Sequence, residues 1–130
     1  MTFEELFENA LRLVAEDPTE GDTSDYEDRA SYILATFCSQ CASADARYRQ
    51  AHKMSAVTVS AVAYVELSEA FPLCDAFAPA ATYYLAAMLT LDENEVLSEK
   101  FFALYTDALA TIQASLPALR ETVTDSYGLI

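Results

Sequence analysis

Residues 67–112, LSEAFPLCDAFAPAATYYLAAMLTLDENEVLSEKFFALYTDALATI, decide the fold of this chain. In both halves of this stretch apolar residues recur at steps of three and four, which is typical of helices that each bury one face. Between the halves, Asp92 is placed to cap the second helix, and Glu95, three positions later, to complete a capping box. Because the connection is short, the pattern predicts an antiparallel helical hairpin.

A second hairpin is predicted in the first 44 residues of the chain. A capping box in residues 2–5 starts an apolar periodic stretch that the proline at position 18 stops. Another capping box in residues 24–27 opens a second helix, which we expect to end near Ala44. The polar connector between them contains both a proline and a glycine, as a loop between two helices often does.

Residues 45–70 carry no clear periodicity. β-branched and aromatic residues between positions 57 and 67 favour an irregular or weakly extended segment, while a short two-strand ribbon and a continuing helix remain open. The next helix begins between Asp75, a candidate cap, and Pro79, a candidate first-turn proline. Pro117 is expected to end or kink the last helix.

These elements predict an all-α fold in which four main helices form two antiparallel hairpins. Two glycines, four prolines and no tryptophan agree with it, because few residues favour turns. We expect residues 1–120 to form a single helical domain and residues 121–130 a mobile C-terminal tail. The predicted core consists of Phe7, Leu11, Val14, Ile33, Leu34, Phe37, Leu85, Met88, Phe101, Leu104 and Tyr105.

The charge of the chain is strongly acidic, with 21 acidic and 7 basic residues and a formal net charge of −14. Such a balance excludes a general attraction for nucleic acid or for anionic membranes. Arg47, Arg49, His52 and Lys53 form the only basic cluster. The simplest interpretation is a solvated surface; the functional alternative is that this cluster of one copy meets the acids of the next copy.

The N-terminus and the apolar runs predict a cytoplasmic protein that does not enter a membrane. Met1–Glu5 is acidic where a secretory signal would be basic and then apolar. The longest uncharged run, residues 76–91, is short for a membrane span and rich in Ala, Thr and Tyr.

Residues that would carry catalysis or hold a cofactor do not form a recognisable motif. Cys38 and Cys41 have C-x-x-C spacing, but a zinc site needs about four ligands, and Cys74 and His52 form no second pair. We therefore interpret the cysteines as small buried hydrophobes. His52 is the only histidine and forms no evident triad, so we expect neither an enzyme nor a cofactor.

The order of these features resembles the head-tail connector (adaptor, or head-completion) proteins of tailed double-stranded-DNA bacteriophages and prophages. The resemblance rests on an N-terminal helix followed by a capped second helix, FEELFENAL at 3–11 and SDYEDRA at 24–30. It continues in the pattern from FPL at 71–73 through ATYYLAAML at 81–89 to FFALYTDAL at 101–109. VTDSYG at 123–128 is similar to the short terminal segment of such proteins.

What the resemblance implies is a helical subunit that forms a ring beneath the portal protein and joins the DNA-filled head to the tail. The expected partners are the portal, neighbouring copies and a possible tail-side connector protein. DNA would pass through the ring without specific binding, since an acidic lumen offers phosphates no cations. Such a protein would begin in the cytoplasm of the bacterial host and end in the neck of the virion.

An interface hypothesis follows for the tail and the basic cluster. Val123, Tyr127, Leu129 and Ile130 supply apolar surface that can dock on a neighbouring subunit or on the portal. Arg47, Arg49 and Lys53 supply cations for the acids of residues 22–28. The alternative function, from another class, is a small helical regulator that binds one partner protein through an exposed apolar groove.

Overall fold

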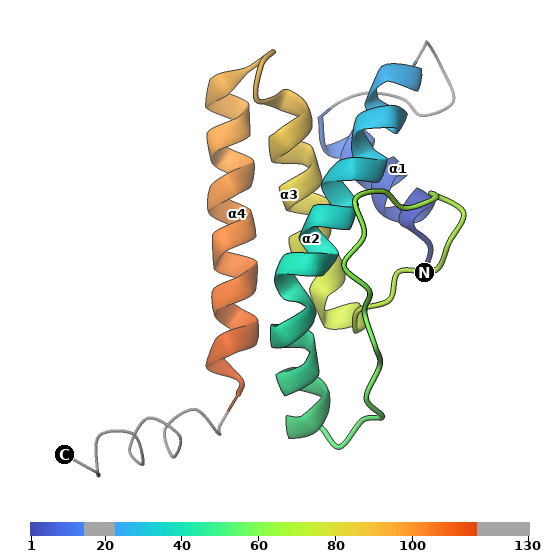
Figure 1. The fold of residues 1–130 in the computed structure, drawn as a ribbon. Helices are drawn as coiled ribbons and strands as arrows, with labels where there is room; N and C mark the ends of the chain where they lie inside the picture. The colour runs from blue at the N-terminus through green and yellow to red at the C-terminus, as the bar shows by residue number, and fades with distance from the viewer. Residues whose placement is uncertain (15–22, 117–130) are drawn as a thin grey trace, which may run out of the picture.

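The computed structural model describes residues 1–14 and 23–116 and is all-helical, with no strand in that part of the chain (Figure 1). The predicted all-α fold with four main helices is therefore confirmed. The helices are α1 (Phe3–Leu13), α2 (Ser24–Ala51), α3 (Ala78–Thr90) and α4 (Glu95–Ala114), and a 3-10 turn, η1 (Asp75–Phe77), precedes α3.

Helix α3 is the element on which the other helices pack. It contacts α1, α2 and α4, whereas α1 and α2 meet each other over a small area (Figure 1). Five of its alanines are buried, and these short side chains let the neighbouring helices approach closely: Ala78, Ala80, Ala81, Ala86 and Ala87. The predicted α3–α4 hairpin forms as expected, with α4 antiparallel to α3 on its outer side.

The predicted cap of α1 is confirmed, whereas the caps predicted for α2 and α4 are wrong. Thr2 caps α1 and forms the predicted capping box with Glu5. The box predicted for residues 24–27 is wrong, because α2 begins at Ser24 itself and Thr23 occupies the cap position. Asp92 is also wrong as the cap of α4, whose cap is Asn94, with its side chain accepting the Leu97 N–H at 3.1 Å.

The shift of the α4 cap has a local cause. The Thr90 carbonyl accepts N–H groups from both Glu93 and Asn94, at 3.1 and 2.8 Å. Residues 91–93 therefore form a turn that continues directly from α3, and Asn94 is the first residue with the non-helical backbone that a cap requires.

Helix α2 is longer than its sequence predicts. The expected end near Ala44 is wrong, because α2 continues to Ala51 and the irregular segment starts only after it. The start of α3 agrees with the expected interval between Asp75 and Pro79, since α3 begins at Ala78. Neither η1 nor α3 has a side-chain cap, so Asp75 does not act as one.

The segment after α2 also holds the N-terminus in place. The Phe3 N–H donates to the Glu69 carbonyl at 3.1 Å, and the Glu4 N–H donates to the Leu67 carbonyl at 2.8 Å. These are donors of the first turn of α1, which no residue of the helix itself can satisfy. The Phe71 N–H completes the contact by donating to the Met1 carbonyl at 2.8 Å.

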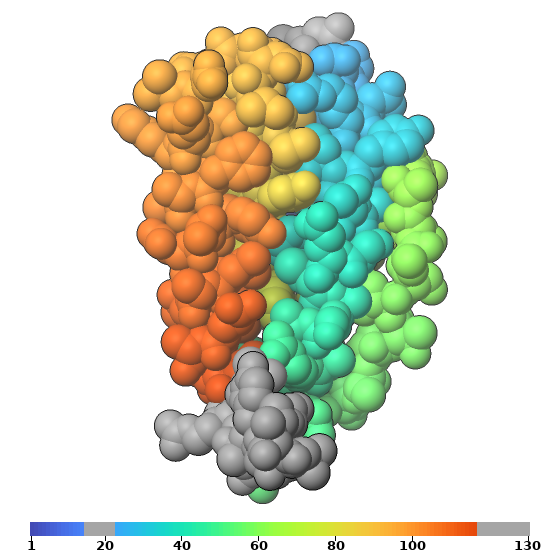
Figure 2. All heavy atoms as spheres, turned by 60° about the vertical axis from the view of Figure 1, so that its left-hand side comes forward, coloured from blue at the N-terminus to red at the C-terminus, as the bar shows by residue number. Residues whose placement is uncertain are grey.

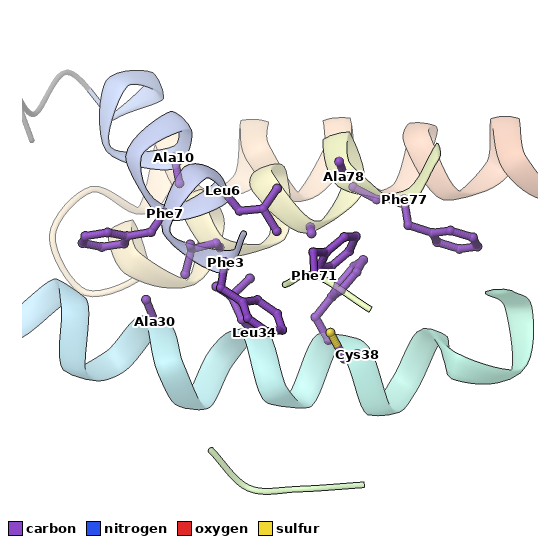
Figure 3. Close-up of a cluster of buried hydrophobic side chains, with 14 of the residues drawn as sticks. Phe3, Leu6, Phe7, Ala10, Ala30, Leu34, Cys38, Phe71, Phe77 and Ala78 are labelled. Carbon is purple, nitrogen blue, oxygen red and sulfur yellow. The ribbon is translucent and has the colours of Figure 1, made fainter. Parts of the chain in front are cut away.

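The core lies between α1, α2 and α3 and includes the segment that returns to α3. Figure 3 shows Phe3 of α1 and Leu34 and Cys38 of α2 gathered around Phe71. The rings of Phe3 and Phe71 meet edge to face, with their centroids 5.9 Å apart. Three further large side chains that the prediction lacked are fully buried here: Leu6, Phe77 and Leu89.

Most of the predicted core is confirmed. Phe7, Leu11, Leu34, Phe37, Leu85 and Phe101 are buried, and Val14, Ile33, Met88 and Tyr105 are half-buried. Leu104 is wrong, because 42% of it is exposed. Helix α4 packs on one side of the bundle and buries only one stripe, and Leu104 projects beside that stripe.

A helix that crosses a membrane has to be both long and apolar. None of the helices within residues 1–14 and 23–116 combines the length and the apolar character of a membrane span.

Leu85 and Leu104 offer a matched pair of substitutions on neighbouring helices. Leu85→Ala leaves a cavity at a fully buried position and should lower the free energy of unfolding by about 2–5 kcal/mol. Leu104→Ala should change it by about 0.5 kcal/mol or less, because the side chain is largely in water. Urea unfolding measures both, and equal losses would contradict the arrangement of α4.

Candidate functional site

A buried ion pair joins the C-terminal part of α2 to the segment that follows it. Asp45 is 1% exposed, and its Oδ2 accepts the Arg49 Nε–H at 2.9 Å. Its other oxygen, Oδ1, accepts the Cys74 N–H at 2.8 Å. The Arg49 guanidinium also donates to the carbonyls of Ser55 and Pro72, both at 3.2 Å. We call these five residues the junction.

The junction gives the buried carboxylate of Asp45 the partners without which its burial would be costly. A carboxylate inside a protein requires a partner of opposite charge and hydrogen bonds to its remaining lone pairs, and Asp45 has both. The hydrogen bond from Arg49 to Asp45 raises the pKa of the guanidinium further above its ordinary value. Both ends of the segment from Ser55 to Pro72 are thereby attached to one helix.

The basic cluster is divided by this arrangement. Arg49, one of the cations proposed for an interface between copies, pairs with Asp45 inside its own chain, and its side chain is 13% exposed. Arg47 is half-buried, and its Nε has no hydrogen-bond partner among the described residues. Lys53 is exposed at the end of α2. Of the three candidate cations, Lys53 is therefore the most accessible to a partner.

Lys53 also ends helix α2. Its φ is 56°, the left-handed conformation that usually belongs to glycine at this position. The Met54 N–H donates to the Arg49 carbonyl at 2.8 Å, and the Lys53 N–H to the Gln50 carbonyl at 3.2 Å. These two bonds form a Schellman motif, which closes the helix and turns the chain into the next segment.

Residues 56–64, which we call the extended segment, run along one flank of the molecule (Figures 1 and 2). Val57, Val62 and Tyr64 are between 44% and 47% exposed. Tyr32 of α2, 56% exposed, meets Tyr64 edge to face with ring centroids 5.2 Å apart. The extended segment and α2 beside it thus present several apolar side chains to water.

Two hollows in the surface lie near the N-terminal helices. The acidic pocket, of about 340 Å³, is lined by Glu4, Glu27, Asp28 and Glu66 and lies beside Tyr64. The apolar groove, of about 440 Å³, lies between α1 and α3 and is lined by residues that include Leu6, Leu13, Pro79 and Tyr83.

The three cysteines are buried, which confirms their interpretation as small hydrophobes, and none forms a disulfide. Burial is the main cause that raises the pKa of Cys38 to about 12 and the pKa values of Cys41 and Cys74 to about 11. The nearby Asp45 carboxylate adds to each shift. At neutral pH these thiols stay protonated, and a protonated thiol is neither a nucleophile nor a metal ligand.

The predicted interface residues of the C-terminal tail have no place in the site described above. The tail residues Val123, Tyr127, Leu129 and Ile130, like Pro117 and Asp22, lie outside the described residues. Within the ranges 1–14 and 23–116, no three side chains of His, Cys, Asp or Glu are grouped to hold a metal ion.

No protein-family model, curated protein or solved structure matches the chain.

Sequence reasoning missed the junction and the ends of the extended segment. Asp45 and Arg49 are four residues apart on a helix, which is a recognisable ion-pair spacing. The signal was available, but the expected end of α2 near Ala44 hid it. No local pattern indicates that Pro72 and Cys74 bind the same pair.

Removal of Asp45 should loosen the segment that follows α2. Asp45→Ala leaves Arg49 without its partner and the Cys74 N–H without an acceptor, so we expect a loss of about 3–5 kcal/mol in unfolding free energy. Hydrogen exchange should accelerate at the amides of Met54 and Cys74 before it does so in α3. Asp107→Ala, at an exposed acid of α4, is the control and should change neither quantity. Unchanged exchange at Cys74 in Asp45→Ala would refute the role of the junction.

The buried thiols should make stability depend on alkaline pH. Above the ordinary thiol pKa of 9.0 the unfolded chain releases protons that the folded chain keeps up to about pH 11, so stability is lost as the pH rises through this range. Cys38→Ala/Cys41→Ala should cost about 1–3 kcal/mol at pH 7 and show a shallower decline in urea unfolding between pH 8 and 10.5. Parallel pH profiles for both proteins would contradict this explanation.

Proposed function

We propose that this chain is a subunit of the head-tail connector of a tailed bacteriophage or prophage, which assembles as a ring beneath the portal. The observation that carries the proposal is a separation of charge along α2. Asp25, Glu27 and Asp28 are exposed at its first turns, and exposed Lys53 follows its last turn. Twenty-eight helical residues span roughly 42 Å, so the two charged ends are far apart.

The acidic end of α2 is joined to a second acidic element. Tyr26 donates through its hydroxyl to both carboxylate oxygens of Glu93, at 2.7 and 2.6 Å. Arg29 donates to the Met88 carbonyl at 3.0 Å, near the end of α3. The α3–α4 turn, with exposed Asp92 and Glu95, therefore lies beside the first turns of α2. This end of the molecule carries a concentrated negative charge.

Opposite charges at opposite ends favour a head-to-tail contact between copies. Such a contact joins two different surfaces. It closes into a ring when a whole number of rotations between neighbours adds up to one full turn. Lys53 of one copy would then meet the acids around Asp25–Asp28 of the next. Arg49 takes no part in this contact, because Asp45 holds it within the chain.

The net charge suits a channel for DNA. Each copy contributes −14, so a ring multiplies that charge and repels phosphates from its lumen. DNA would pass without being held, since cations are what bind the phosphate backbone. The proposed partners are the portal, neighbouring copies and a tail-side connector protein, and the proposed locations are the host cytoplasm and then the neck of the virion.

The test is a joining assay with the portal protein of the same phage. Deletion of residues 121–130 should leave a folded protein that no longer joins heads to tails, because the tail supplies the apolar contact. A full-length variant with serine at positions 123, 127, 129 and 130 is the control, because it removes the apolar side chains and keeps the length of the tail. It should fail to join heads to tails to the same degree. Normal joining by the truncated protein would overturn the role of the tail. No binding of the full chain to the portal would overturn the connector.

The apolar groove between α1 and α3 supports the second candidate, a small helical protein-binding regulator. Its volume of about 440 Å³ and its apolar lining fit one face of an amphipathic helix from a partner. The neighbouring genes separate the two candidates. Genes for portal, capsid and tail proteins favour the connector, and isolation among regulatory genes favours the regulator.

A further inference from the structure

The extended segment presents a backbone without hydrogen-bond partners. Within the part of the chain that the structure describes, no hydrogen bond reaches the N–H or carbonyl groups of residues 56–64. Such groups are a template for a further strand, as at the open edge of a sheet. Water satisfies them in the isolated molecule, and a partner strand would replace that water.

The sequence of the segment is compatible with a strand. From Ser55 to Val65 it reads SAVTVSAVAYV, with no charged residue, proline or glycine. Valine, threonine and tyrosine favour extended backbone. The same residues leave apolar surface in water, notably at Val57, Val62 and Tyr64. These side chains belong to an uncharged run of a chain whose net charge is −14.

The segment is fixed at both ends, and its backbone contains neither helix nor turn, with one bend at Ala63. Before it, the Arg49 guanidinium donates to the Ser55 carbonyl at 3.2 Å. After it, the Val65 N–H donates to the Ser31 carbonyl of α2 at 3.2 Å. A strand that is already extended loses little further backbone entropy when it pairs, which favours association.

We propose that the extended segment pairs with the same segment of a second copy of this chain, as an antiparallel two-stranded ribbon with its two-fold axis at Ser60. Ser60 is the midpoint of residues 56–64, and before the bend at Ala63 this register places Thr58 of one copy opposite Val62 of the other. With the two copies of Ser60 as a hydrogen-bonded pair, each strand satisfies the backbone groups of alternate residues of its partner, and water keeps the others. Successive side chains of a strand point to opposite faces, so Val57 on one face and Val62 and Tyr64 on the other each gain a cross-strand neighbour.

The charges that flank the segment determine this direction of pairing. Lys53 precedes it, and Glu66 follows it beside the acidic pocket with Glu27 and Asp28. In an antiparallel pair, Lys53 of each copy lies near Glu66 of the other. A parallel pair would place lysine beside lysine and the two acidic pockets beside each other, which like charges oppose.

This pairing goes beyond the connector and does not depend on it. A two-fold pair is a closed contact between identical surfaces, whereas a ring that joins a head to a tail needs contacts between different surfaces. The ribbon would therefore belong to the free protein and would have to open before a ring formed. A monomeric free protein would refute the ribbon and leave the connector untouched.

The first experiment uses disulfide formation to locate the two-fold axis. Ser60→Cys places two thiols opposite each other, so mild oxidation of the full-length protein should give a covalent dimer. Val57→Cys is the matched control, because its two copies would lie roughly 20 Å apart along the ribbon, out of reach of a disulfide. The three native cysteines are buried and are present in both variants, so any cross-link that they form contributes equally to both yields. Equal yields of dimer from both variants, or none from Ser60→Cys, would overturn the proposal.

The second experiment measures association without a cross-link. Analytical ultracentrifugation should show a concentration-dependent dimer for the full-length protein and for Ser60→Ala, which keeps its N–H. Ser60→Pro should be monomeric, because proline removes the central donor of the ribbon. Residue 60 makes no hydrogen bond within the described chain, so both variants should have the circular-dichroism spectrum of the original. A Ser60→Pro protein that dimerises like Ser60→Ala would refute the pairing.

A charge exchange tests the antiparallel direction. Lys53→Glu and Glu66→Lys should each raise the dissociation constant of the dimer by roughly three- to tenfold, since each places like charges together twice. The double variant Lys53→Glu/Glu66→Lys should restore the original value. Failure of the double variant to recover would exclude this register. A dimer that is lost only when residues 121–130 are deleted would assign the contact to the tail instead.

Discussion

The buried pair of Asp45 and Arg49 is the interaction on which the irregular segment between α2 and η1 depends. The two side chains bind each other, and they also bind backbone groups of Ser55, Pro72 and Cys74. A segment of this length without secondary structure normally lacks a fixed path. Here it has one because its two ends are attached to the same helix, and the N-terminus is attached in turn through Phe3 and Glu4.

The helices themselves could be predicted because their information is local. Apolar spacing located α3 and α4, and Thr2 with Glu5 located the start of α1. Errors arose where two neighbouring residues were equally suitable as caps, as with Asp92 and Asn94. The choice between them depends on the hydrogen bonds at the end of α3, which a propensity cannot weigh. The prediction that Leu104 is buried was wrong for a similar reason. Periodicity shows that one face of a helix is apolar, but it does not show how much of that face the neighbouring helices cover.

The end of α2 and the candidate site were harder to predict because they depend on contacts between distant residues. A helix end is usually marked by glycine, and here a lysine adopts the left-handed conformation, so position 53 carries no signal. The extended segment reads in sequence as a weak strand, and only the structure reveals that no strand in the described chain lies beside it. Partners outside the chain are the part of a fold that a single sequence describes least.

The alanines of α3 decide which substitutions the core of this fold tolerates. In most cores the damaging changes remove volume, because large side chains fill the centre. At Ala80, Ala81, Ala86 and Ala87 there is almost no volume to remove, and because these positions are fully buried a longer side chain has to displace its neighbours. Added methyl groups are therefore the dangerous changes, at about 1–3 kcal/mol each. Descendants of this sequence can vary freely in the size of their outer residues while the central helix has to remain small.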